Sequence, residues 1–281
     1  MLELPNHVSF SQYNTYTDCP RNWYLSKIRK AEECQTYYLP IGTAVHQMVE
    51  DWLDDDHGRP DGYFPSAESF FFPLIRQQML IEPDTTKWLA GGPEKDPVVG
   101  DKALQKVKDC FETALEFLDD IDVWEVEYDA SGSLPGLDVE VKAFADIIGE
   151  HKKHGPTILD WKTGSKKPGN NFQLETYAAL LQVDKKWWNL TEDRPIKFKG
   201  LWAMLDPNAS VARPIDLSAV DPAEVGAKYQ KAWEGMKSMQ IQANKKYMCK
   251  MCFNKDNCME YSGMTPRTVH YDRSHIDQPP Y

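Results

Sequence analysis

The sequence predicts an α/β fold in which a central mixed β-sheet is flanked by helices. Apolar residues recur at helical spacing in residues 42–53 and 101–121, and they alternate with acidic residues from residue 123 onward. Strand-like and helix-like segments then follow one another, which is typical of a mixed sheet covered by helices. The chain has 281 residues, 41% of them hydrophobic, so it can bury a substantial core. No internal repeat is evident.

The N-terminal part is predicted to be mainly helical. Residues 9–30 indicate two short helices, and Pro20 suits the first turn of the second. Residues 42–53 and 101–121 each have one apolar face, which predicts two longer helices. Residues 57–100 lie between them and are rich in proline, glycine and aromatic residues. We expect this stretch to be irregular and to form an insertion.

The second half of the chain changes to the pattern of a sheet. Alternating or continuous apolar runs are bounded by turn residues, which is the signal of half-buried and buried strands. Two segments between and after these runs have helical periodicity. The predicted strands are residues 123–128, 137–149, 157–163 and 197–205, and the predicted helices are residues 171–184 and 221–240.

The charge of the chain limits how it could contact nucleic acid. The net charge of −11 argues against nonspecific binding over the whole surface, because phosphates repel an acidic protein. A local basic groove remains possible, since lysines and arginines cluster in residues 21–30, 162–167 and 245–250. No apolar stretch approaches the length of a membrane span, and the N-terminus MLELPNHVSF lacks a signal-peptide pattern. We therefore expect a cytoplasmic protein.

Two aspartates and a lysine form the first candidate site. Asp146 lies in one predicted strand and Asp160 near the end of the next, so neighbouring strands would bring both carboxylates to one point. Two close carboxylates need a cation, and oxygen ligands suit Mg²⁺ or Mn²⁺. Lys162 shares a strand face with Asp160 and could orient a water molecule or stabilise charge on a phosphate. The alternative is a strand that ends in ordinary polar residues.

The next predicted helix adds two polar side chains. Gln173 and Tyr177 are four residues apart, on one helical face, shortly after Lys162. Gln173 could bond a base, a phosphate or a metal-bound water, and Tyr177 could contact phosphate. Taken alone, the pair is equally explained as an ordinary polar helix face.

In this order, Asp146, Asp160-x-Lys162 and Gln173-x-x-x-Tyr177 resemble the PD-(D/E)xK nucleases of the RecB type. In the helix GTAVHQMVE, His46 stands where many of these nucleases have a metal-binding histidine. The resemblance implies a restriction-endonuclease-like core, with Gln173 and Tyr177 in catalysis and DNA binding. It also implies a metal held by His46, Asp146, Asp160 and the carbonyl of Trp161. The sequence departs from the family pattern at residues 143–145, which read Ala-Phe-Ala where a basic residue is common. Glu127 is a further candidate acid in the preceding strand.

The cysteines form the second candidate site. Cys249, Cys252 and Cys258 lie close in sequence, and Cys19 is the natural fourth ligand. Four thiolates suit zinc, but paired local CxxC motifs are commoner for that metal. One N-terminal and three C-terminal cysteines, together with the segment YTDCPRNWYL, resemble the iron–sulfur subgroup of RecB-type nucleases. The resemblance implies a [4Fe–4S] cluster that ties the two ends of the chain together. We expect the remaining two cysteines, Cys34 and Cys110, to be structural.

The resemblance implies a metal-dependent exonuclease that acts on single-stranded DNA or DNA ends in recombination, repair or CRISPR adaptation, with protein partners from these processes. Arg21 is a candidate phosphate contact, with a surface arginine as the equal alternative. No nucleotide-binding GxxxxGK[ST] loop is present, so no ATP-driven motor is expected. A different class of function is a nonenzymatic DNA-end-binding scaffold with a vestigial site.

The implied organisation is one nuclease unit over residues 1–281. It comprises a helical part (1–56), an insertion and long helix (57–122), the core (123–240) and a cluster-binding segment (241–281).

Overall fold

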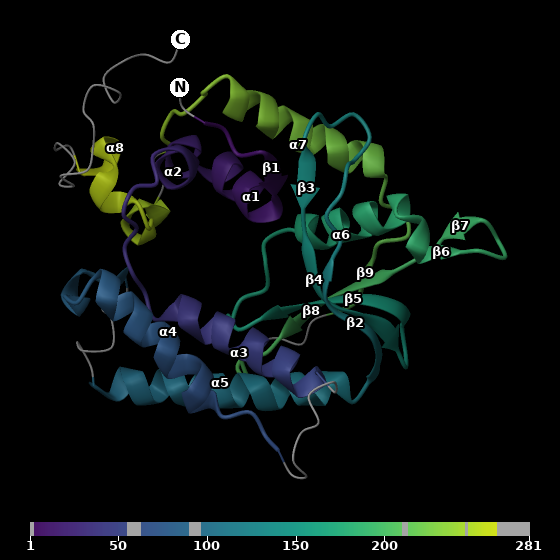
Figure 1. Cartoon of the computed structure of the whole chain (residues 1–281), viewed down its shortest axis with the longest axis horizontal. Coiled ribbons are helices and arrows are strands. Elements are labelled where there is room, and N and C mark those ends of the chain that lie inside the picture. Colours follow the sequence, from purple (N-terminus) through teal and green to yellow (C-terminus); the bar gives the residue numbers. More distant parts are fainter. Residues whose placement is uncertain (1–2, 55–62, 90–96, 210–212, 245–246, 263–281) are drawn as a thin grey trace.

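The computed structural model describes residues 3–54, 63–89, 97–209, 213–244 and 247–262. Its centre is a five-stranded sheet with the strand order β2-β4-β5-β8-β9 (Figure 1). The pairs β2–β4, β4–β5 and β8–β9 are antiparallel, whereas β5 and β8 are parallel, so the sheet is mixed. The strands are β2 (Ile121–Asp129), β4 (Phe144–His151), β5 (Gly155–Lys162), β8 (Lys199–Met204) and β9 (Ile215–Asp216).

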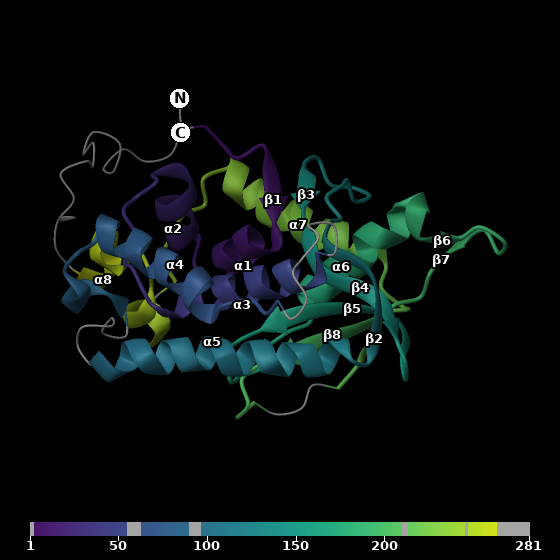
Figure 2. The same ribbon diagram turned by 60° about the horizontal axis from the view of Figure 1, so that its bottom comes forward.

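Helices cover both faces of this sheet. One face carries α3, α4 and α5, which lie together as a layer in Figure 2. The other face carries α1, α6 and α7. The bounds are α1 (Phe10–Asp18), α3 (Tyr38–Leu53), α4 (Ala67–Ile81), α5 (Pro97–Leu118), α6 (Phe172–Val183) and α7 (Pro222–Lys237).

The central strands are buried on both faces, and alternate side chains enter different cores. Ile147, Leu159 and Leu201 pack with the α3–α5 layer. Their sequence neighbours Ile148, Ile158 and Trp202 pack with the α6–α7 layer. This explains why β5 and β8 are almost continuously apolar, as expected for strands covered on both faces. The predicted α/β class, with a mixed sheet between helices, is confirmed.

The prediction of an irregular stretch over residues 57–100 is wrong in its middle part. Helix α4 contains FFFPLI, begins after Ser66 and continues through Pro73 to Ile81. The Ser66 hydroxyl accepts a hydrogen bond from the Ser69 N–H, which caps the helix. Phe71 is buried against the α3–α5 layer, so packing outweighs the helix-breaking tendency of the proline. Residues 55–62 and 90–96 lie outside the described ranges.

The N-terminal segment is helical, as expected, but its second helix changes type. Helix α2 (Pro20–Trp23) continues directly into a π-helix, Tyr24–Ile28. The predicted strand over residues 137–149 is divided at Ala143 into β3 (Glu140–Lys142) and β4. The sequence pattern did not indicate the short strands at residues 7–9, 188–189 and 194–195. Strand β1 (His7–Ser9) pairs in parallel with β3 (Glu140–Lys142), and β6 (Trp188–Asn189) pairs with β7 (Arg194–Pro195).

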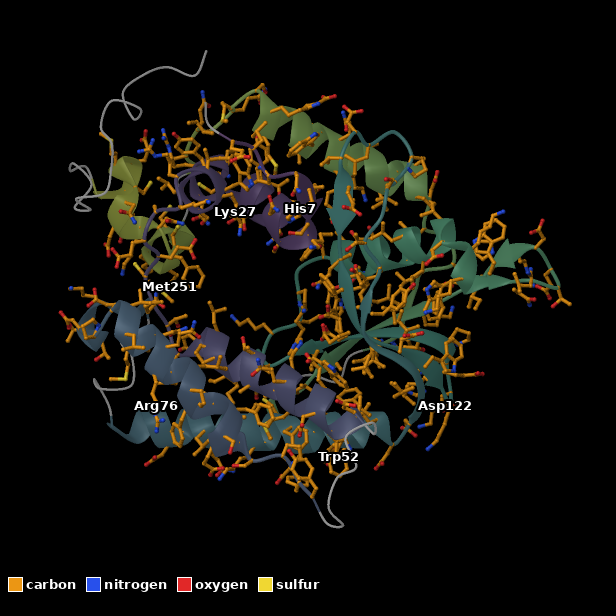
Figure 3. The ribbon with its side chains drawn as sticks, in the orientation of Figure 1. His7, Lys27, Trp52, Arg76, Asp122 and Met251 are labelled. Atoms are coloured by element: carbon orange, nitrogen blue, oxygen red, sulfur yellow. The ribbon has the colours of Figure 1, made fainter. Side chains whose placement is uncertain are left out.

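The two ends of the described chain lie against each other. The Cys34 N–H donates to the Phe253 carbonyl at 2.8 Å. The Asn257 side chain donates to the Glu32 carbonyl at 2.7 Å. Three short elements complete this C-terminal part: the 3₁₀-helices Tyr247–Met251 and Lys255–Asn257, and α8 (Met259–Ser262). In Figure 3, Lys27 and Met251 mark this junction, whereas Trp52 and Asp122 lie on the opposite side of the molecule.

Among the described helices, none combines the length and the apolar composition that crossing a membrane requires.

Candidate active site

The candidate site lies where strands β4 and β5 separate. Their paired register ends at Ile147 and Leu159, and the next residues are Asp146 and Asp160. The Asp146 side chain enters the gap, where its Oδ2 accepts a hydrogen bond from the Trp161 N–H at 2.7 Å. Both aspartates are buried, with 7% of Asp146 and 1% of Asp160 exposed. The expected meeting of two carboxylates at one point of the sheet is therefore found.

Three side chains from three elements converge beside this gap. Within the described ranges, His46, Glu127 and Asp146 are the group of potential ligands whose ligand atoms all lie within 4.8 Å of one another. His46 Nδ1 is 3.6 Å from Asp146 Oδ1 and 3.7 Å from Glu127 Oε1. Helix α3 supplies His46, strand β2 supplies Glu127 and strand β4 supplies Asp146.

The backbone of Glu127 is unusual. Its neighbours Val126 and Tyr128 pair with Ile147 and Ala145, so Glu127 lies opposite Asp146. Its φ angle is +45°, a left-handed conformation that costs a non-glycine residue about 1–2 kcal/mol. Strain of this kind is concentrated at functional sites, where it fixes the direction of a side chain. Here the Glu127 carboxylate is directed towards His46.

A second set of contacts surrounds Asp160. The Lys162 ammonium forms an ion pair with Asp160 Oδ2, and it lies 5.1 Å from the centre of the Trp202 ring. On the other side, the Tyr177 hydroxyl donates to Asp160 Oδ1 at 3.4 Å. The Gln173 side chain in turn donates to the Tyr177 hydroxyl at 2.8 Å. Asp160 is therefore held between a cation from its own strand and a hydroxyl from α6.

Burial and mutual repulsion make the metal-free site electrostatically unfavourable. Desolvation, followed by the negative charge of Asp160, raises the pKa of Asp146 to about 8. Desolvation also raises the pKa of Asp160, although Lys162 opposes the shift. Burial lowers the pKa of His46, but the contact with Glu127 and the charges of Asp146 and Glu127 outweigh it and raise that pKa.

The donor set fits a divalent metal ion. Two carboxylates and one imidazole are ligands that divalent metals accept, and a cation here would relieve the repulsion between buried carboxylates. The ion would also replace the proton that Asp146 otherwise retains near neutral pH. His46, Glu127 and Asp146 could therefore hold such an ion.

Most of the predicted site residues come together here, and one is elsewhere. Asp146, Asp160, Lys162, Gln173 and Tyr177 form a connected set with His46, and the Trp161 backbone joins it through its N–H. Arg21 lies on α2, with its guanidinium 6.0 Å from the centre of the Tyr24 ring. Its neighbour Asn22 lines the cysteine cavity described below.

Glu127 is the residue that sequence reasoning did not assign to the metal. Glu125 and Glu127 alternate with apolar residues in the same strand, so the pattern alone does not separate a ligand from a surface acid. The distinguishing feature is a left-handed backbone angle, and a glutamate gives no sequence signal for it.

The cysteines divide between three places. Cys19, Cys249, Cys252 and Cys258 line one cavity of about 490 Å³. Cys110 is fully buried in α5, and the Cys34 thiol contacts Asp256. No three cysteine sulfurs in the described ranges lie within 4.8 Å of one another. A tetrahedral zinc site, with Zn–S bonds of about 2.3 Å, would bring its sulfurs to about 3.8 Å. In the part of the chain that the structure describes, the cysteine sulfurs are therefore not arranged as a metal or cluster site.

The pKa of Asp146 leads to a prediction about stability. The unfolded chain loses this proton near pH 4, whereas the metal-free native state keeps it until about pH 8. The unfolded state then binds fewer protons, so stability falls by about 1.4 kcal/mol per pH unit across that window. We expect Asp146→Asn to raise the melting temperature of the metal-free protein by several degrees at pH 7.5 and to have little effect near pH 4.

Asp206 provides the control with the opposite sign. It is similarly exposed, at 8%. Burial raises the pKa of Asp206, but the hydrogen bonds from Lys106 and Asn208 and the charge of Lys106 together outweigh burial and lower that pKa. Asp206→Asn should therefore lower the melting temperature at pH 7.5. If Asp146→Asn and the wild type have equal melting temperatures at pH 7.5, the raised pKa of Asp146 does not lower the stability of the native state.

Several known proteins are similar to this chain. A family model described as the PD-(D/E)XK nuclease superfamily matches residues 7–259. The Gene 69 protein of Mycobacterium phage D29 is 27% identical over 204 residues, which cover 65% of this chain and 71% of the phage protein. The crystal structure of a candidate exonuclease from Eubacterium rectale aligns with a TM-score of 0.45 and 14% identity, over 88% of this chain and 87% of that one. Because the family model spans nearly the whole chain, this protein belongs to the PD-(D/E)XK nuclease superfamily.

Proposed function

We propose that this protein is a Mg²⁺- or Mn²⁺-dependent deoxyribonuclease that works as an exonuclease on single-stranded DNA or DNA ends. The observation that supports this most directly is that two groups of side chains lie next to each other. The potential ligands His46, Glu127 and Asp146 lie directly beside the Asp160–Lys162 ion pair. A nuclease needs both a cation site and a positive side chain at the scissile phosphate.

Each residue has a distinct part in this proposal. His46, Glu127 and Asp146 would hold the metal ion, with Asp160 and the Trp161 carbonyl as further ligands. When bound, the ion would polarise the scissile phosphate and make a bound water more acidic. Lys162 would orient that water and stabilise charge on the phosphate in the transition state. Gln173 and Tyr177 would fix the position of Asp160 and contact the substrate.

The order of contacts supports a positioning role for α6. Tyr177 is 5% exposed, and burial raises the pKa of its hydroxyl well above its usual value, so it remains a hydrogen-bond donor at any working pH. The donor is aimed at Asp160 Oδ1, and Gln173 directs its own amide to the same hydroxyl. The oxygen of Asp160 is thereby fixed before substrate arrives, which is the preorganisation that catalysis requires.

We also propose a [4Fe–4S] cluster bound by Cys19, Cys249, Cys252 and Cys258. The support for it is that these four side chains line one cavity, between the N-terminal helices and the C-terminal segment. Ligation by four cysteines is the ordinary mode for such clusters. The cluster would be structural, because it would join the N-terminal helices to the C-terminal segment. With it, residues 1–281 would form a single nuclease unit.

A cleavage assay tests the proposed activity. The anaerobically purified protein would be incubated with Mg²⁺, Mn²⁺ or EDTA and three DNAs: a linear single strand, the same strand as a closed circle, and a blunt duplex. We expect metal-dependent release of nucleotides from the linear strand, no cleavage of the circle, and no activity in Asp160→Ala. Labels at the 5′ or 3′ end would give the polarity of digestion. If the wild type binds DNA but cleaves none of these substrates, the protein is instead a DNA-end-binding scaffold.

A further inference from the structure

An exposed aromatic ring stands beside the metal ligands. Phe144 lies two residues before Asp146 on the same strand, β4. Asp146 is buried in the gap between β4 and β5, whereas 45% of Phe144 is exposed. Within the described ranges, no other aromatic ring lies against Phe144. The ring therefore offers a free face about 7 Å along the strand from a metal ligand.

The loop that follows Lys162 carries two further cations. This loop, residues 163–171, starts directly after Lys162 and ends directly before the first residue of α6, the helix that carries Gln173 and Tyr177. Lys166 and Lys167 lie in this loop, are exposed, and take part in no ion pair within the described ranges. Lys162, Lys186 and Lys199, in contrast, are each paired with a carboxylate.

A third side of the site is acidic and would repel DNA. Beyond Glu127 lies a depression of about 700 Å³ whose walls include Glu50, Asp51 and Asp54. Phosphates cannot lie over this surface without strong repulsion. The backbone of a bound DNA strand is therefore directed away from the depression and towards Lys166 and Lys167.

We propose that Phe144 and the Lys166–Lys167 loop form a track that selects one unpaired DNA strand at the metal site. One base stacks on the Phe144 ring, and the adjoining phosphates contact the two lysines while the scissile phosphate meets the ligand group. Stacking on a protein ring requires a base that has left its duplex, so the track favours single strands over paired DNA. This inference rests on the proposed nuclease function and adds the residues that choose the substrate.

The first test concerns the ring. A strand that carries 2-aminopurine at successive positions would be bound to the Asp160→Ala protein, because stacking quenches this base. We expect quenching at one position, its loss in the double variant Asp160→Ala/Phe144→Ala, and its recovery with Phe144→Trp. In the active protein, Phe144→Ala should raise KM for single-stranded DNA about 10-fold, since each stacked base contributes about 1–3 kcal/mol. The value of kcat should change little.

The second test concerns the lysines. The double variant Lys166→Ala/Lys167→Ala should lower the slope of log affinity against log salt by about 1.4, since each phosphate contact on a single strand contributes about 0.7. The matched control is Lys152→Ala/Lys153→Ala, which removes two consecutive lysines from the turn at the far end of β4 and β5. Phe72→Ala is the control for the ring, because Phe72 is 39% exposed on α4.

The outcomes separate this inference from the proposed function. Cleavage with unchanged KM and unchanged quenching in Phe144→Ala would overturn the track and leave the nuclease intact. A salt slope equal in the two lysine variants would overturn the phosphate contacts. If the wild type cleaves no DNA, the proposed function fails, but the quenching and salt measurements still decide whether the track exists.

Discussion

Lys162→Ala should reduce the rate of DNA cleavage by at least about 10²- to 10³-fold, the usual cost of removing one group that stabilises transition-state charge. Lys162 is the cation next to the candidate ligands, and its ammonium is held in place by Asp160 and the Trp202 ring. Alanine removes this charge without adding bulk. The measurement is single-turnover cleavage of single-stranded DNA at saturating metal and enzyme, so that kcat is separated from binding.

Lys199→Ala is the matched control for this prediction. Lys199 lies on the neighbouring strand β8 and is also paired with an aspartate, Asp216, at 3.0 Å. Because that pair is on the surface, its loss should alter stability by no more than about 1 kcal/mol and leave cleavage unchanged. If Lys162→Ala cleaves DNA within 10-fold of the wild-type rate, Lys162 does not take part in the chemistry.

Cys252→Ser should have the largest effect on the stability of the purified protein. Under the proposed cluster, a metal centre joins residue 19 to residues 249–258 and closes a loop of more than 200 residues. Binding of the centre contributes directly to folding, because the unfolded chain has no such site. We expect Cys252→Ser to lose iron, sulfide and the brown colour, and to melt many degrees below the wild type.

Cys34→Ser tests whether this effect belongs to the cavity. Cys34 lies in the same junction, with its backbone bonded to Phe253, but its thiol does not line the cavity. The serine variant should therefore keep its iron and its melting temperature. Iron-free wild-type protein that contains stoichiometric zinc would refute the cluster. An unchanged melting temperature in Cys252→Ser would refute its structural role.

The fold was predictable where one physical signal was strong. Strands β4, β5 and β8 are buried on both faces, and their apolar runs are long enough to be identified. The two-residue strands β6, β7 and β9 are too short to show any periodicity. Helix α4 was missed because Pro73 normally argues against a helix interior, and only the buried contacts of its aromatic residues reveal why it is tolerated.

The candidate site was predictable for a different reason. Asp146 and Asp160 interrupt apolar strands. A buried acidic residue lowers the stability of the fold unless its charge is paired or binds a metal ion. Glu127 carries no such signal, because it lies in a half-exposed strand with other acidic residues. Its role depends on a backbone angle of +45° and on its register with Asp146, and both properties arise only when the sheet assembles.

The contact between the two ends of the chain has a consequence for how the protein is made. The N-terminal helices and the segment that follows them are hydrogen-bonded to Gln240, Phe253, Asn254 and Asn257, which are synthesised more than 200 residues later. Domains usually fold as units during synthesis, with N-terminal parts first. Here the N-terminal segment stays incomplete until more than 200 further residues have been synthesised. A prematurely terminated chain would expose the apolar surfaces of Trp23 and Leu25 and would be recognised by chaperones and proteases as unfinished.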